Sequence, residues 1–558
     1  VLYHAETIKG KAIDEIMGDL LLEFLGALDI GKTMRWGSYH FEFARPVRSL
    51  LVMHGSEVIN CEIFGVRSAN STFVHRMYSF EKQAIGDIDN FEDFLSKKGV
   101  ILSAQKRREK ILSDFAQIEQ ENPHLMIDRD ESLLNEIVAL TEYPNAIIGK
   151  FDESFLELPQ EVIIVSMKSN QRYFPIFANG RLTNRFVVVS NAFCENFSEV
   201  IRGNEKVLRP RLSDALFFWR NDLNNALPDE PLKHITYAHG LGTIYDKQKR
   251  ECEIVKRLQT LLEITDQHID RATALSKLDL ASQMVYEFTE LQGIMGMHYA
   301  RKLGENEAVA TAIGEQYLPI GEDSALPTTQ TGALLAVATK IDSLMALFSI
   351  RHIPSGSKDP LGLRRAASGI IRIAIDRRWH LKISQLIAAI ADLYAPFDQG
   401  RLATFFKERL FSLLPANISI IKAVLATNED DLSVIKEKVE ALANVSASAD
   451  FKANFALFKR VANILKDQDL LAFGAVDRSL FETVEESALF DAFVGIQQGG
   501  DPTRQLEALF GLKETLGAFF DAVMVNAENA RIRGNRLALL AGIYSAFLQV
   551  ADIKEISF

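Results

Sequence analysis

The chain has 558 residues, of which 47% are hydrophobic and 24% are charged. This balance is typical of globular proteins and excludes collagen-like and disordered chains; at roughly 150 residues per domain it predicts about three or four domains. The 62 basic and 74 acidic residues give a net charge of −12. A histone-like, bulk binder of nucleic acid is therefore excluded, and any RNA-binding surface must be a local one.

The cysteines and the apolar runs indicate a cytoplasmic protein without membrane contact. Cys61, Cys194 and Cys252 are far apart and form no C-x-x-C motif, which argues against a disulfide framework and a four-ligand zinc site. The longest apolar run, 332–339, stops at Lys340 and is much shorter than the about 18 residues of a membrane span. No signal-peptide pattern follows Val1, and the missing initial Met leads us to expect a truncated N-terminus.

Two patterns of apolar residues predict a multidomain α+β protein. Between about 34 and 220, short apolar runs predict strands mixed with a few helices, as at 39–43, 50–53, 162–165 and 186–189. The pair Asn179-Gly180 between two such runs predicts a hairpin turn. From about 240 onward, apolar residues three and four apart predict helices, as over 254–264, 334–348, 361–375 and 536–550.

Two motifs that could carry chemistry are discounted. Residues 26–33 fit the P-loop formula, but the predicted helix before them and strand after them reverse the strand–loop–helix order of a phosphate-binding loop. His239, Asp246 and Asp279 could belong to a metal site like that of the HD phosphohydrolases, whose His-Asp pair binds the metal. Leu278 stands in the position of that histidine and cannot bind a metal. We predict a degenerate helical domain without a metal and keep an HD-type metal-dependent phosphohydrolase as the alternative function.

The first basic cluster lies in 351–380, where seven lysines and arginines stand against two aspartates. Within it, the segment 354–360 leads into a predicted helix, with Asp359 as its cap and Pro360 at its first position. Such a loop can present N–H groups and a lysine to a phosphate. The residues alone leave a solvated helix face equally open. The candidate contacts are Lys358, Arg364, Arg365 and Arg372.

Two further basic clusters lie near the C-terminus. Lys459 and Arg460 alternate with phenylalanines, and Arg531, Arg533 and Arg536 precede a long terminal helix. Cations beside aromatic rings suit unstacked RNA bases and their backbone, although phenylalanines at helical spacing are more often core residues. Residues 202–215 are also rich in cations; there we favour a salt-bridged helix that joins the two parts of the chain.

Short segments spread over essentially the whole chain, in family order, resemble the β chain of bacterial heterotetrameric glycyl-tRNA synthetases. They are 34–37 (MRWG), 43–47 (FARPV), 158–162 (LPQEV), 166–168 (SMK), 171–175 (QRYFP), 203–208 (GNEKVL), 211–215 (RLSDA), 241–247 (LGTIYDK), 290–296 (ELQGIMG), 356–360 (GSKDP), 458–464 (FKRVANI) and 535–540 (NRLALL). The family has about a hundred further residues before this start, so contacts made by such a segment are not assigned.

The resemblance implies a division of labour between two kinds of subunit. In this family the α subunit makes glycyl-adenylate from ATP, and the β subunit recognises tRNA(Gly) and supports glycine transfer within an α2β2 tetramer. This chain therefore should bind no cofactor itself, while ATP and Mg²⁺ serve the α subunit. The absence of recognisable class I or class II synthetase motifs agrees with a chain that is not catalytic alone.

The resemblance also implies four regions and a place for each basic cluster. Residues 1–228 resemble the editing module of the phenylalanyl enzyme's β chain, 229–395 resemble an HD-type helical domain, 396–448 form a helical linker, and 449–558 resemble helical anticodon-binding domains. The two C-terminal clusters are expected at the anticodon arm. The first cluster is expected on tRNA backbone elsewhere.

Overall fold

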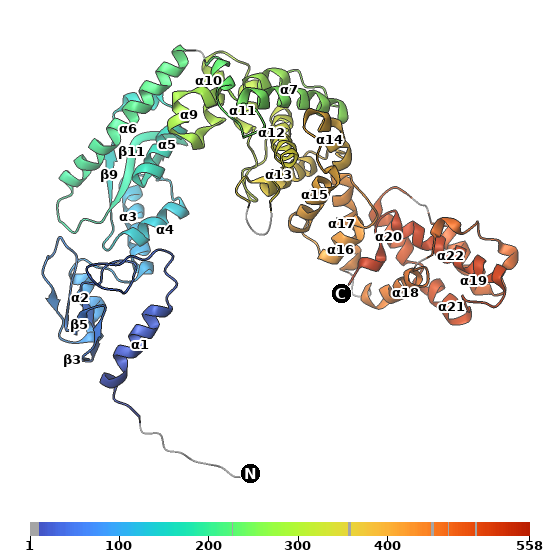
Figure 1. The fold of residues 1–558 in the computed structure, drawn as a ribbon, viewed down its shortest axis with the longest axis horizontal. Helices are drawn as coiled ribbons and strands as arrows, with labels where there is room; N and C mark the ends of the chain where they lie inside the picture. Colours follow the sequence, from blue (N-terminus) through green and yellow to red (C-terminus); the bar gives the residue numbers. More distant parts are fainter. Residues whose placement is uncertain are drawn as a thin grey trace, which may run out of the picture. The chain divides into compact units, whose positions relative to one another are not determined.

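The computed structural model describes residues 10–225, 227–354, 359–447, 451–466, 468–496 and 499–557. The chain divides into two compact units, Val1–Arg220 and Asn221–Phe558, and the division falls within helix α6 (Ser198–Asn224). Figure 1 draws the first unit in blue to turquoise and the second in green to red. A mixed α and β chain is confirmed, whereas the predicted boundaries at 228, 395 and 448 stay predictions.

The N-terminal part of the first unit consists of helix α1 (Ile13–Ala27) and short strands. Among the described residues, the strands pair as β1-β5-β4, β2-β3 and β6-β7, followed by the turn η1 (Ile88–Asn90) and helix α2 (Phe91–Lys97). The strands are β1 (Leu50–Leu51), β2 (Met53–His54), β3 (Glu57–Val58), β4 (Glu62–Ile63), β5 (Val66–Ala69), β6 (Ser71–Thr72) and β7 (Gln83–Ala84).

An antiparallel sheet in the order β8-β10-β11-β9 forms the second part of this unit. Its buried side chains pack with those of two helices in one apolar core that includes Phe115, Leu134 and Val187. Phe186 of β11 lies opposite Gly149 of β9, and a side chain at 149 would meet its ring at 2.5 Å. The elements are α3 (Ala104–Glu121), β8 (Leu125–Ile127), α4 (Glu131–Leu140), β9 (Asn145–Lys150), β10 (Tyr173–Ala178) and β11 (Arg181–Ser190).

The structure confirms the predicted hairpin and corrects two predicted strands. Asn179 and Gly180 join β10 to β11 with φ values of +49° and +76°, as a two-residue hairpin turn requires. The run 162–165 is helical, in α5 (Gln160–Val165) followed by the π-helical turn η3 (Ser166–Gln171). A short buried apolar run does not distinguish strand from helix by its periodicity. The run 39–43 forms an aromatic cluster with Trp36 and Phe64 instead of a strand.

Among the described residues of the second unit, all regular elements are helices, and β pairing is limited to isolated bridges. One continuous apolar core extends from Ile254 to Ile556, and the four predicted helices lie in α7, α12, α13 and α22. The helices are α7 (Ile244–Leu261), α8 (Ile269–Leu275), α9 (Gln283–Glu287), α10 (Ile294–Lys302), α11 (Glu307–Glu315), α12 (Gln330–Ser349), α13 (Leu363–Asp376), α14 (Ile383–Ile390), α15 (Gln399–Leu413), α16 (Ile418–Leu425), α17 (Leu432–Ser446), α18 (Phe451–Ile464), α19 (Val484–Val494), α20 (Pro502–Phe510), α21 (Lys513–Ala522) and α22 (Ala530–Leu548).

Short turns of 3-10 helix connect these helices. Before α14 they are η4 (Glu230–Lys233), η5 (Leu278–Ala281) and η6 (Thr289–Leu291), and after it η7 (Ala391–Leu393), η8 (Leu470–Ala472), η9 (Arg478–Leu480) and η10 (Ile553–Glu555). In the first unit, η2 (Glu153–Glu157) follows β9.

Helix α12 is the central core helix of the second unit. By length and composition it is apolar enough to cross a membrane, but 94% of its most apolar window is buried inside the protein. Its two charged side chains are buried as well. The Lys340 ammonium donates to the Tyr317 carbonyl oxygen at 2.8 Å, and burial lowers the pKa of Lys340 to about 7.

Asp342 of α12 is the shared acceptor of a buried polar network. Its carboxylate accepts from Lys247 Nζ and Arg250 Nε, each at 2.7 Å, and from the Tyr394 hydroxyl at 2.8 Å. Lys247 also lies 3.1 Å from Glu251, a fully buried carboxylate that is 3.0 Å from Lys277. Isolated buried charges are very costly, so these side chains are stable in the core only as a set.

We expect Asp342→Ala to lower the free energy of unfolding by about 3–5 kcal/mol, because it removes the carboxylate that the buried Lys247 and Arg250 charges share. Urea denaturation followed by circular dichroism measures this. The matched control is Asp392→Ala, which removes an exposed aspartate paired with Arg257 and should change stability little. Equal effects of the two substitutions would contradict the structural role of Asp342.

Candidate nucleic-acid interface

The first predicted cluster surrounds the start of α13. Lys358 lies outside the described residues. The Asp359 carboxylate accepts from the first two helical N–H groups, at 2.9 and 2.8 Å, so its side chain stabilises the helix start, although the N-cap residue is Gly362 and not Asp359 as predicted. The helix begins at Leu363 and not at Pro360, because Gly362 precedes it with a φ of +68°, a conformation that interrupts the helical path and favours glycine. The predicted position of Pro360 is wrong.

The three arginines of α13 differ in how accessible they are. Arg365 is exposed and Arg364 is half-buried. The guanidinium of Arg372 donates to the carbonyl oxygens of Gly321 and Ser324, at 2.8 and 2.9 Å. Arg372 therefore holds the loop before α12, and Arg365 is the residue of this helix that is best placed to meet a phosphate.

The second cluster has one half-buried and one exposed cation. Lys459 Nζ donates to the carbonyl oxygen of Ile556 at 3.0 Å, which ties α18 to the C-terminal segment. The guanidinium of Arg460 is exposed and lies 4.3 Å from the centre of the Phe520 ring. The neighbouring phenylalanines are buried core residues and not base platforms, as their helical spacing favoured; they are Phe451, Phe455 and Phe458.

The third cluster opens helix α22. Arg531 is exposed, and its backbone N–H donates to the side chain of Asn529, the N-cap residue. Arg533 is half-buried and donates to the carbonyl oxygen of Ala527 at 3.2 Å. Arg531 is thus the arginine of this cluster with the most accessible guanidinium.

Arg536 is an internal residue with only 6% of its surface exposed. Its guanidinium donates to Glu486 at 2.7 Å, to Glu482 at 2.8 Å and to the carbonyl oxygen of Met524 at 3.0 Å. Burial acts to raise the pKa of Glu486, but the hydrogen bonds from Arg536 and two backbone amides lower it below its usual value. The prediction that Arg536 contacts RNA is corrected: this arginine joins α22 to α19.

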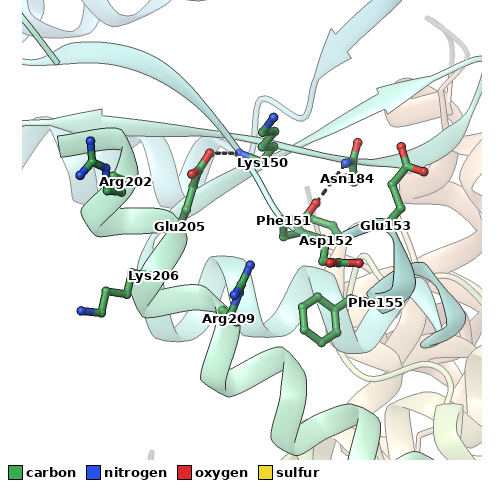
Figure 2. A pocket seen from close by; sticks show the side chains of 10 residues that line it. All are labelled: Lys150, Phe151, Asp152, Glu153, Phe155, Asn184, Arg202, Glu205, Lys206 and Arg209. Carbon is green, nitrogen blue, oxygen red and sulfur yellow. Dashed lines mark hydrogen bonds between the residues drawn. The ribbon is translucent and has the colours of Figure 1, made fainter. Parts of the chain in front are cut away.

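A pocket of the first unit holds cationic residues that the sequence reasoning did not assign to a site. Its volume is about 750 Å³, and it lies between α6 and the segment that follows β9. In Figure 2, Arg209 extends from α6 into the space beside Asp152 and Phe155. The spacing of Arg202, Lys206 and Arg209, four and then three residues apart, is the sequence signal that places them on one helix face.

The residues considered for an HD-type metal site have other roles. Asp246 completes the capping box of α7 with Thr243, and His239 is exposed. The Asp279 carboxylate accepts from the backbone N–H groups of Gly293 and Gly296 at 2.5 and 3.1 Å. Burial raises the pKa of Asp279 to about 6. Among the described residues, no three metal-binding side chains lie close enough to share an ion.

Comparisons with known proteins agree on one family. The family model described as "Glycyl-tRNA synthetase beta subunit" matches residues 1–426. The glycine–tRNA ligase beta subunit of Helicobacter pylori is 39% identical over 100% of this chain and 83% of its own length. The beta subunits of Glaesserella parasuis and Streptococcus mutans are each 36% identical, over 99% and 100% of this chain and 83% of their own lengths.

Arg536→Ala should lower the free energy of unfolding by about 3 kcal/mol, because it leaves the buried Glu486 carboxylate without its main partner. Thermal denaturation measures the loss. Arg531→Ala, which truncates an exposed arginine of the same helix, is the control and should leave the melting temperature unchanged. If Arg536→Ala keeps full stability and loses tRNA affinity instead, the internal role assigned to Arg536 is wrong.

Proposed function

This chain belongs to the glycyl-tRNA synthetase beta subunit family and is a subunit of an aminoacyl-tRNA ligase, and on this premise we propose that it recognises tRNA(Gly) and supports the transfer of glycine to it. The overall reaction joins glycine to tRNA(Gly), converts ATP to AMP and diphosphate, and takes place in the cytoplasm. The word "beta" in the relatives' names supports a partner α subunit. We propose an α2β2 assembly without membrane contact.

We place the formation of glycyl-adenylate, with its ATP and Mg²⁺, on the α subunit. The local structure around the P-loop-like residues supports this placement. Helix α1 includes the first two of them and ends at Ala27, and an isolated bridge between Met34 and Phe43 follows. A phosphate-binding loop instead needs a strand before it and a helix N-terminus after it.

The observation that carries the proposal is the set of exposed arginines in a strongly acidic chain. Arg365, Arg460 and Arg531 are each exposed and come from the three basic clusters, while the chain carries a net charge of −12. Contacts between arginine and phosphate position an RNA, and a few polar groups then read its bases. We propose that residues 449–558 meet the anticodon arm and that Arg365 contacts the tRNA backbone elsewhere.

The division of labour is tested by separating the chain from its partner. The isolated chain should bind tRNA(Gly) in a salt-sensitive manner and should show no glycine-dependent pyrophosphate exchange. When the α subunit is coexpressed, the two chains should copurify. The α subunit alone should catalyse the exchange, and glycylation of tRNA should need both chains. Pyrophosphate exchange by the isolated chain would contradict the proposal, as would an absence of tRNA binding.

Charge reversal of the exposed arginines tests where tRNA binds. Arg365→Glu and Arg531→Glu should each weaken tRNA(Gly) binding about five- to tenfold and reduce the salt slope by about 1, because each loses one phosphate contact. Filter binding across a salt series measures both quantities. Lys302→Glu reverses an exposed charge of the same unit outside the clusters and should leave affinity unchanged. An unchanged affinity for a cluster variant removes that residue from the interface.

A further inference from the structure

Helix α6 lines the pocket of the first unit with cations and turns a different face to the interior. Arg202, Lys206 and Arg209 line the pocket. Leu208 and Leu212 on another face are completely buried, and this burial fixes the rotation of the helix. At 1.5 Å of rise per residue, Arg202 and Arg209 are spaced about 10 Å along the axis. The helix therefore presents a cationic edge of defined direction and length.

Hydrogen bonds hold α6 against the opposite wall of the pocket. The Glu205 carboxylate accepts from the backbone N–H of Lys150, at the end of β9, at 2.9 Å (Figure 2). Nearby, the Tyr173 hydroxyl donates to the Asn204 side chain at 2.7 Å. The bond to Lys150 fixes the position of the Glu205 carboxylate at the edge of the pocket. These hydrogen bonds preform the pocket in the absence of a ligand.

The opposite wall supplies hydrogen-bond acceptors. Asn184 exchanges hydrogen bonds with the backbone of Phe151, at 3.0 and 2.9 Å, and so fixes the segment after β9. One carboxylate oxygen of Asp152 accepts from the backbone and the hydroxyl of Ser154. Glu153 is exposed, and its carboxylate has no hydrogen bond or ion pair with another described residue. Figure 2 shows the side chains of Asn184, Asp152 and Glu153 along one side of the pocket.

The cations of the pocket are only partly neutralised. Arg202 pairs with Glu199 at 2.9 Å, whereas Lys206 and Arg209 are exposed and form no ion pair with a described carboxylate. Arg209 interacts electrostatically with Asp152 of the opposite wall, but neither cation has a direct ion-pair partner among the described residues. Two such cations at one wall attract an anion, most strongly a phosphate. The volume of about 750 Å³ is within the range that holds a ligand of nucleotide size.

We propose that this pocket binds a phosphate-bearing ribonucleotide, with the phosphate on Arg209 and Lys206 and the sugar hydroxyls donating to Glu153. The phosphate accounts for the cations on α6, and the hydroxyls account for a carboxylate that would repel a bare anion. A nucleotide of bound tRNA and a free mononucleotide share this chemistry. The tRNA source rests on the proposed function, and the binding chemistry does not.

The test compares Lys206→Gln/Arg209→Gln with Arg181→Gln in the full chain. Arg181 is an exposed arginine of the same unit that does not line the pocket. Calorimetry with AMP and filter binding with tRNA(Gly) give the two affinities. The pocket variant should lose at least tenfold in affinity for one of these probes, and the control should lose none. A tenfold loss for tRNA identifies RNA as the source, and a loss for AMP alone identifies a free nucleotide.

The proposal is overturned if the pocket variant keeps both affinities or if the control loses as much. Glu153 gives an independent arm. The wild-type chain should prefer AMP to 2′-deoxyadenosine 5′-phosphate several-fold, or an oligoribonucleotide to its deoxy counterpart as a competitor of tRNA, and Glu153→Gln should abolish the preference. A wild-type chain without any such preference contradicts the role of Glu153.

These outcomes also separate the pocket from the proposed function. If the Lys206→Gln/Arg209→Gln variant keeps its affinity for both tRNA and AMP, the pocket proposal is contradicted and the proposed function is not affected. A chain that binds AMP through Arg209 but does not bind tRNA supports the pocket proposal and contradicts the proposed function. Since the substituted residues are exposed, an unchanged melting temperature is expected and checks that each variant is folded.

Discussion

The second unit depends on keeping several charges inside an apolar core. Asp342 is completely buried and has Lys247, Arg250 and Tyr394 as donors, so α7, α12 and the segment after η7 have to meet at one point. Because an unpaired buried charge is strongly destabilising, any arrangement that separates these elements is disfavoured. The network restricts how the helices pack, while the surrounding apolar side chains supply the burial.

The same constraint decides which basic residues are available to an RNA. Sequence reasoning located the three clusters, because an excess of cations in an acidic chain is visible without a structure. It could not separate Arg365, Arg460 and Arg531 from Arg372 and Arg536. That distinction depends on partners about 50 residues away in the chain, such as Glu486 for Arg536 and Gly321 for Arg372. Local composition therefore predicts a cluster, and only tertiary structure shows which of its side chains face solvent.

Prediction of the fold from the sequence succeeded where the periodic pattern of apolar residues was long and failed where that pattern was short. Helix α12 repeats its apolar pattern over 20 residues, and the Asn179-Gly180 turn has a specific backbone requirement, so both were predicted correctly. The four apolar residues at 162–165 fit a buried strand and a buried helix equally well. At the start of α13, Asp359 was predicted as the cap, but the left-handed Gly362 takes that position and shifts the first helical turn beyond Pro360.

A chain with a net charge of −12 that binds a polyanion faces a general electrostatic difficulty. At physiological salt, charges more than about 8 Å apart are largely screened, so the overall repulsion is weak and the contacts at each site decide the binding. A single exposed arginine contributes little to affinity. Several weak sites that engage one RNA molecule together raise affinity through effective concentration. Under the proposed function, the dispersed exposed arginines and the pocket beside α6 would act as such sites, and selectivity for one tRNA would come from whether all of them can be occupied at once.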